Sequence, residues 1–392
     1  MKPRHRTIWI AVLLALWPSA GFSAQAQGAE AGAEKESPEL EKLTKEWRLV
    51  LLERRKALMR DLEANEESLA LLTFELLEIE LALATEPNQR AKALQKHLGH
   101  LKQIEIDCKA QYEKKKLDEA TYLKWKVARL DAEITVFEDQ KIDPKTAQGK
   151  EQTKALRDLL EKRLELTREE FELRQEAAEN ERGPRYDLVL SNMSGRMLQA
   201  ELALAGSAKE RQAALKKHLD NLKVVEKAAA AGVEVGRTGP TDYWPPRAAR
   251  LDAEIAFLRA KNLGSSPEKV EKDPPTVREL LKERRGLLRD TVGFWKKLEL
   301  LDRRSGARPE LPEASFQLLD AELELASNSK TRVTALESHL EILRQAEKFH
   351  KSQIDARSPV ARPADYLRLK TARLETEIQL LKEKGKQAKS TK

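Results

Sequence analysis

The sequence predicts an all-α fold of three tandem repeats, each built from antiparallel helical hairpins packed like coiled-coil bundles. Charged residues make up 35% of the 392 residues and aromatic residues only 5%, a composition typical of long helices. The phrase Ala-Leu-x-x-His-Leu-x-x-Leu begins at Ala93, Ala214 and Ala335, at a constant interval of 121 residues. A second phrase, Ala-Arg-Leu-Asp/Glu-x-Glu-Ile, follows each copy. Such a period indicates a duplicated supersecondary unit, and repeat architectures of this kind usually bind partners.

The chain begins with the layout of a secretory signal peptide. Three basic residues precede an apolar run over residues 8–17, and small residues follow. This predicts a signal peptide over residues 1–26, cleaved after Ala24 or Ala26. We therefore expect a secreted or periplasmic protein with no transmembrane segment after cleavage. The alternative, an uncleaved membrane anchor, is disfavoured because Pro18 directly follows the apolar run, which is too short to span a bilayer.

The net charge of +7 suggests nucleic-acid binding, but the positive charge lies at the two ends of the chain. The signal segment carries +3 and the lysine-rich end from Lys382 to Lys392 carries +4, so residues 27–381 have no net charge. A surface of mixed charge lacks the one-signed face that phosphate binding requires. No nucleic-acid partner is expected.

Composition shifts divide the mature chain into a leader, three helical repeats and a basic tail. The leader covers residues 27–39, the repeats cover 40–142, 151–263 and 276–384, and the tail covers 385–392. Turn and breaker residues occupy the joints between repeats. The first repeat has no Gly or Pro between Leu40 and Pro87, so its first two helical segments are candidates for fusion into one long helix.

Four helical segments are expected in each repeat. The first contains Leu51 to Arg55 in repeat 1, and its counterparts begin at Leu159 and Leu280. The second carries an apolar stripe and ends at a short polar break, after which the third begins. In repeat 2, Ser207 and Glu210 at this break have the spacing of a capping box.

The fourth segment has the clearest heptad pattern. Its apolar residues follow a 4-3-4-3 spacing, which makes a narrow seam that must face another helix. The seam includes Leu130, Ile134, Leu251, Ile255, Leu374 and Ile378. Because turn residues separate the third segment from the fourth, the two should form an antiparallel hairpin.

The fourth segment and the turn before it resemble the periplasmic helical hairpin of outer-membrane efflux proteins of the TolC type. The similarity lies in Gly236-x-x-Gly239-x-x-Asp242-Tyr243 followed by the Ala/Leu-rich start of the helix, about 30 residues per repeat. That family also has transmembrane strands, and it carries two copies of its unit where this chain has three. The resemblance implies a helical hairpin of the periplasmic type and does not imply a channel.

One histidine recurs in the third segment of every repeat, as His97, His218 and His339. These residues fit a pH-sensitive or metal-binding site assembled from several repeats. The favoured interpretation is structural: each imidazole lies at the edge of the apolar stripe and hydrogen-bonds a neighbouring helix. No second ligand keeps metal-ligand spacing in all three copies, so no metal site is predicted.

Other recurring polar residues lie on the fourth segment. Its first turn carries a tyrosine, as Tyr122, Tyr243 and Tyr366, which we expect to pack against the preceding turn, with ligand stacking as the alternative. Arg and Glu recur four residues apart and predict surface or interhelical ion pairs: Arg129 with Glu133, Arg250 with Glu254, and Arg373 with Glu377. The single cysteine, Cys108, is expected on a helix face, with a reactive or intermolecular thiol as the alternative.

The sequence indicates a class of function but not a specific activity. Nothing pairs a nucleophile with a base in all three copies, so no catalytic residue, cofactor or metal is predicted and an enzyme is disfavoured. We expect a scaffold or protein-binding module whose partners include cell-envelope proteins or a second copy of the chain. The alternatives are an accessory of an envelope efflux or secretion assembly that docks through its hairpins, and binding of anionic polymers or lipid headgroups through the basic tail.

Overall fold

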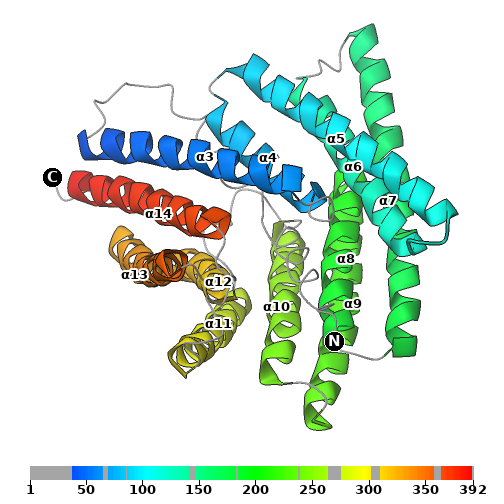
Figure 1. Ribbon diagram of the computed structural model, residues 1–392. Helices are drawn as coiled ribbons and strands as arrows, with labels where there is room; N and C mark the ends of the chain where they lie inside the picture. Colours follow the sequence, from blue (N-terminus) through cyan, green and yellow to red (C-terminus); the bar gives the residue numbers. More distant parts are fainter. Residues whose placement is uncertain are drawn as a thin grey trace. The chain divides into compact units, whose positions relative to one another are not determined.

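The computed structural model describes residues 38–64, 69–84, 86–140, 146–181, 184–236, 239–263, 275–301, 310–356 and 363–390. These residues form twelve α-helices and no β-strand, which confirms the predicted all-α fold (Figure 1). The expected signal peptide and most of the expected leader lie outside the described residues. No described helix is both long enough and apolar enough to cross a membrane.

Each repeat contributes four helices, labelled here as in Figure 1. Repeat 1 contains α3 (Pro38–Ala64), α4 (Leu69–Leu83), α5 (Pro87–Glu113) and α6 (Glu119–Asp139). Repeat 2 contains α7 (Ala147–Glu181), α8 (Pro184–Leu204), α9 (Ala208–Glu234) and α10 (Pro240–Leu263). Repeat 3 contains α11 (Pro275–Leu301), α12 (Glu310–Leu325), α13 (Ser329–Asp355) and α14 (Pro363–Ser390). The expected fusion of α3 with α4 concerns residues 65–68, which lie outside the described part of the chain.

Local sequence signals set the helix ends. The predicted capping box is confirmed: the Glu210 amide donates to Ser207 Oγ over 3.2 Å, and the Ser207 amide donates to Glu210 Oε2 over 3.1 Å. Asn328 caps α13 through its side chain, whose Oδ1 accepts a 2.9 Å hydrogen bond from the Thr331 amide. Pro240 and Pro363 begin α10 and α14, where a missing backbone N–H leaves no helical hydrogen bond unmade. These breaks place the third and fourth helices of each repeat where the sequence predicts them.

The third and fourth helices pack as antiparallel hairpins, as predicted. In repeat 1, Arg90 near the start of α5 donates to Asp139 at the end of α6 over 2.6 Å. Arg129, earlier in α6, donates to Glu105, later in α5, over 2.5 Å. This reversed order fixes the antiparallel sense. Between the two helices lies a core that includes Leu94, Leu98, Leu101, Ala128 and Ala132.

The helices form two compact units, and these cut across the first repeat. One unit contains α4 to α10 (residues 67–273). The other contains α3 together with α11 to α14, from residues up to 66 and from 274 onward. Although α3 and α4 are consecutive in the chain, α3 packs on α14. The first helix of repeat 1 thus completes the unit formed by repeat 3.

The α14–α3 pair resembles the α6–α7 pair, because each joins the fourth helix of one repeat to the first helix of another. In the α6–α7 pair, Asp131 of α6 forms an ion pair with Arg163 of α7. The repeat counterpart of Asp131 on α14 is Glu375, which accepts a 3.1 Å hydrogen bond from Nε1 of Trp47 on α3. In both pairs the fourth helix of one repeat therefore offers an acidic residue to the first helix of another.

Burial corrects the sequence alignment of α3 by one residue. The prediction matched Leu51 and Leu52 with the leucine pair that begins at Leu159 and with the pair that begins at Leu280. Instead Val50 and Leu51 are each 2% exposed, whereas Leu52 is 42% exposed. In this register Trp47, Val50, Leu51 and Arg54 share one face, at the i, i+3, i+4 and i+7 spacing of a helical stripe. The alternative register would turn Arg48 inward in place of Trp47, so less apolar surface would be buried.

Candidate functional site

The recurring histidines lie between the second and third helices of their repeats, each opposite a small hydroxyl residue. In repeat 2, His218 Nδ1 is 2.8 Å from Ser194 Oγ, and in repeat 3, His339 Nδ1 is 2.7 Å from Ser315 Oγ. Thr73 occupies this place in repeat 1, where its backbone is hydrogen-bonded to His97. The hydroxyl residues were not predicted from the sequence, although they recur at the same interval: Thr73, Ser194 and Ser315.

Aromatic rings flank two of these imidazoles. The Phe74 and His97 rings meet edge to face with centroids 4.9 Å apart, and those of Phe316 and His339 do so at 4.5 Å. Both histidines and their hydroxyl partners are buried. Within the described residues, His97 Nδ1 and His339 Nε2 have no hydrogen-bond partner. Each imidazole therefore fills apolar space and uses few of its polar atoms.

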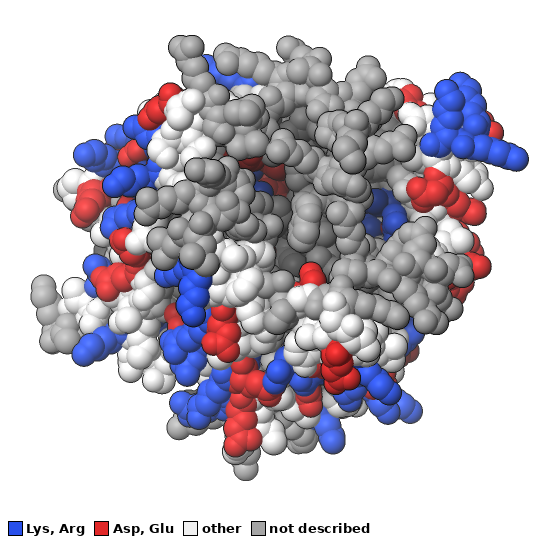
Figure 2. All heavy atoms as spheres, turned by 60° about the horizontal axis from the view of Figure 1, so that its bottom comes forward, with Lys and Arg blue, Asp and Glu red and all other residues white. Residues whose placement is uncertain are grey.

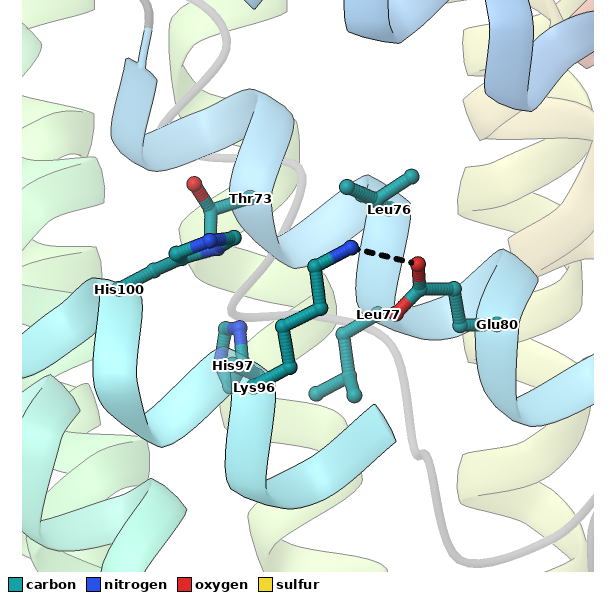
Figure 3. Close-up of a pocket in the computed structure, with 7 residues that line it drawn as sticks. All are labelled: Thr73, Leu76, Leu77, Glu80, Lys96, His97 and His100. Atoms are coloured by element: carbon teal, nitrogen blue, oxygen red, sulfur yellow. Dashed lines mark hydrogen bonds and ion pairs between the residues drawn. The ribbon is translucent and has the colours of Figure 1, made fainter. Parts of the chain in front are cut away.

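Figure 3 shows the repeat 1 version of this site, between α4 and α5. Lys96 reaches across to Glu80 in an ion pair of 3.2 Å, and His100 lies one turn from His97 on the same helix (Figure 3). The cavity that these residues line measures about 10 Å³, close to the minimum volume that one water molecule needs. The site is a packed contact between two helices.

Burial lowers the pKa of His97, His218 and His339 to about 4. His100 adds to this lowering for His97, whereas Glu80 opposes it there and Glu201 opposes it for His218. For His339, burial alone accounts for the lowered pKa. All three imidazoles are therefore neutral near pH 7. The described residues hold no group of three or more His, Cys, Asp or Glu side chains arranged to bind a metal ion.

Each hairpin of third and fourth helices is joined by one arginine that contacts two glutamates. In repeat 2, Arg250 donates to Glu226 of α9 over 2.8 Å and to Glu254 of its own helix over 2.6 Å. The other two groups are Arg129 with Glu105 and Glu133, and Arg373 with Glu347 and Glu377. The predicted pairs within the fourth helix are confirmed. The third-helix glutamates were missed, although their regular interval was the signal that could have identified them.

The recurring tyrosines stand beside these groups. Tyr243 donates a 3.2 Å hydrogen bond to Glu226, which also accepts a hydrogen bond from Arg250. Tyr122 stacks on Tyr112 of α5 with ring centroids 5.4 Å apart. Burial raises the pKa of Tyr122, Tyr243 and Tyr366. In the first two repeats the tyrosine contacts the third helix of its own hairpin, near the turn.

The seam residues of the fourth helices lie inside the helix contacts. Leu130, Leu251 and Leu374 are each 0% exposed, and Ile134 and Ile255 are also buried. Ile378 is half-buried. In repeat 1, Leu130 packs with Leu123, Val127 and Leu166, the last from α7. This face of α6 thus joins repeat 1 to repeat 2.

A buried charged cluster lies where α6, α7 and α8 meet, and it was not predicted from the sequence. Glu170 of α7 is completely buried, and its carboxylate is 3.5 Å from both Arg174 and Arg196. Burial raises the pKa of Glu170, and the two guanidinium groups oppose that rise. Burial also lowers the pKa of the nearby Lys124. The aligned residues of repeat 3 are Thr291, Trp295 and Gln317, so repeat 3 does not carry this cluster.

The cysteine, the basic tail, one cavity and the surface charge are the other features that bear on function. Cys108 is half-buried on α5, and burial raises the pKa of its thiol. The helix α14 continues to Ser390 through much of the expected tail. Lys386 in that tail pairs with Glu383, and Lys384 just before it pairs with Glu337, each at 2.8 Å. A cavity of about 290 Å³ lies between the start of α5 and the end of α6. On the described surface seen in Figure 2, basic and acidic side chains are interspersed.

No protein-family model matches the chain, and no curated protein matches it. The resemblance of the fourth helices to the TolC-type hairpin stays a prediction from the sequence.

Proposed function

We propose that this protein is an exported, non-enzymatic helical-repeat scaffold that binds other proteins, with cell-envelope proteins as its partner class. The observation that carries this proposal is the arginine with two glutamates, which occurs once in each repeat. In every copy these charges join the third helix to the fourth. The residues that recur most regularly therefore maintain the repeat itself, and repeat proteins present the surfaces so built to their partners.

The histidines support the same proposal. A general base must reach its substrate and must titrate near the working pH. His97 and His339 are buried against aromatic rings, and their pKa values are lowered to about 4. A neutral, enclosed imidazole suits a structural role between two helices.

The test is affinity capture from the envelope of the producing cell, with the mature protein as bait. We expect the same envelope proteins to be recovered in repeated captures. A matched bait with Ile106→Glu and Val224→Glu, at two of the most exposed large apolar residues, should recover less of any partner that binds those faces. Recovery of a cytoplasmic pool that retains the first 26 residues would contradict export, and turnover of a small molecule by the purified protein would contradict a non-enzymatic role.

A second candidate is an accessory of an envelope efflux or secretion assembly. The antiparallel hairpins α5–α6, α9–α10 and α13–α14 favour it, because hairpins can dock against the hairpins of a partner. Co-purification with outer-membrane proteins would distinguish it, since a free scaffold should elute without them.

A further inference from the structure

The first and last described helices of this chain carry the two halves of one interface. The fourth helix of repeat 1, α6, binds the first helix of repeat 2, α7. The fourth helix of repeat 3, α14, likewise binds the first helix of repeat 1, α3. The contact that joins consecutive repeats is therefore also made between the two ends of the chain. Every copy of the chain carries both complementary helices, which cover each other within that copy.

The contact between α3 and α14 is specific in charge as well as in shape. Trp47 donates to Glu375, and Glu46 lies 3.5 Å from Lys370 and 4.0 Å from Arg373. Val50 and Leu51 of α3 are almost fully buried. A helix that replaces α3 on α14 must supply the same apolar pair and the same polar partners, and α3 of a second copy supplies all of them.

Chain connectivity does not favour the contact within one copy strongly. The helix α7 follows α6 directly, whereas Trp47 and Glu375 are 328 positions apart in the sequence. Within one copy, the chain holds α3 near α14 at a certain effective concentration. A second copy can compete for α14 when its own concentration reaches that value.

We propose that α3 exchanges between copies, so that two chains form a dimer in which α3 of each lies on α14 of the other. Such a dimer has two-fold symmetry and fills both contacts, so neither α3 nor α14 remains uncovered. The monomer and the dimer then contain the same set of helix contacts. This inference does not rest on the proposed function or on export.

Crosslinking of mixed single-cysteine variants tests the exchange. In a Cys108→Ala background, one variant carries Glu46→Cys on α3 and the other carries Lys370→Cys on α14, at positions that face each other across the contact. The two are mixed, incubated at high concentration and treated with a short bismaleimide. We expect a crosslinked dimer of one chain of each kind on a denaturing gel. While the dimer is the minor species, its fraction should rise about tenfold for a tenfold rise in concentration.

Two controls make the result decisive. Leu52→Cys, on the outward face of α3, replaces Glu46→Cys in a matched mixture and should give little product. The double variant Glu46→Cys with Lys370→Cys in one chain reports the contact within a copy. If the double variant crosslinks as a monomer while the mixture gives no more dimer than the Leu52→Cys control, α3 does not exchange. Light scattering on the unsubstituted protein must also show a dimer that dissociates on dilution, and a strictly monomeric protein at every concentration would overturn the proposal.

Discussion

Trp47 Nε1 donates a 3.1 Å hydrogen bond to Glu375 Oε1, and this bond joins the first described helix of the chain to the last. It lies beside Val50 and Leu51, which are buried on the same helix. The partner of α3 is therefore a helix from the other end of the sequence. Repeat 3 depends on repeat 1 for the helix that covers α14.

Replacing Leu51 with Ala should destabilise the protein by about 2–5 kcal/mol, because the change leaves a cavity at a position that is 2% exposed. The control is its neighbour: Leu52→Ala, at a position 42% exposed, should cost about 1 kcal/mol or less. Denaturant unfolding followed by circular dichroism measures both. Equal losses for the two leucines would mean that α3 takes the register that the sequence alignment predicts.

Replacing Arg250 with Met should cost about 2–3 kcal/mol in the free energy of unfolding. The Arg250 side chain is 16% exposed, so its loss leaves Glu226 and Glu254 close together without their shared cation. Arg157→Met is the matched control, since Arg157 pairs with Glu161 on the same helix while 69% exposed, and should cost less than about 0.5 kcal/mol. If the two variants unfold at the same denaturant concentration, the arginine with two glutamates does not hold the hairpin.

Stability should fall as the pH falls from about 6.5 to about 4, in part because of His339. Its pKa is about 4 in the folded protein and about 6.5 when unfolded, so the unfolded state binds the proton more readily within this window. The stability that the neutral imidazole contributes is complete above pH 6.5. It decreases by roughly 1.4 kcal/mol per pH unit as the pH falls toward 4.

His339→Gln tests this pH dependence, because glutamine does not titrate. The difference in unfolding free energy between pH 7 and pH 4.5 should be smaller in His339→Gln than in the unsubstituted protein. His100→Gln, at an exposed position of α5, should change that difference less. An unchanged pH profile in His339→Gln would show that this imidazole titrates normally.

The charged cluster at α6, α7 and α8 should respond to exchange with the residues of repeat 3. Glu170→Thr alone should cost about 3–5 kcal/mol, because Arg174 and Arg196 lose a buried carboxylate. Adding Arg174→Trp and Arg196→Gln should restore much of that loss, since Glu170 and the two guanidinium groups that contact it are then removed together. Additive losses across the three substitutions, measured by thermal unfolding, would contradict a coupled cluster.

Local signals explain why most of the fold was predictable. Ser207 with Glu210 and the prolines at Pro240 and Pro363 act within one turn of the helix that they begin, so the chain itself carries the information. The seam is also local in origin, because its spacing shows which side of the helix is apolar. Leu130, Leu251 and Leu374 are fully buried on that side.

The partner of α3 was not predictable by the same means. A heptad pattern shows that a face must be covered, and three similar repeats offer three similar faces to cover it. The choice of α14 depends on contacts such as Glu46 with Lys370, which are hundreds of positions apart. Ser194 and Ser315 were missed for a different reason: they recur at the 121-residue interval, but a small hydroxyl residue on a helix has no assigned role until its histidine partner is known.

Amide hydrogen exchange in α14 is the most direct test of the pairing between the first and last helices. The mature protein is compared with a variant that lacks residues up to 66 and therefore lacks α3. The pairing predicts that amides of α14 near Leu374 and Glu375 exchange faster without α3, while those of α5 and α6 keep their protection. Unchanged protection of α14 in the shortened protein would contradict it.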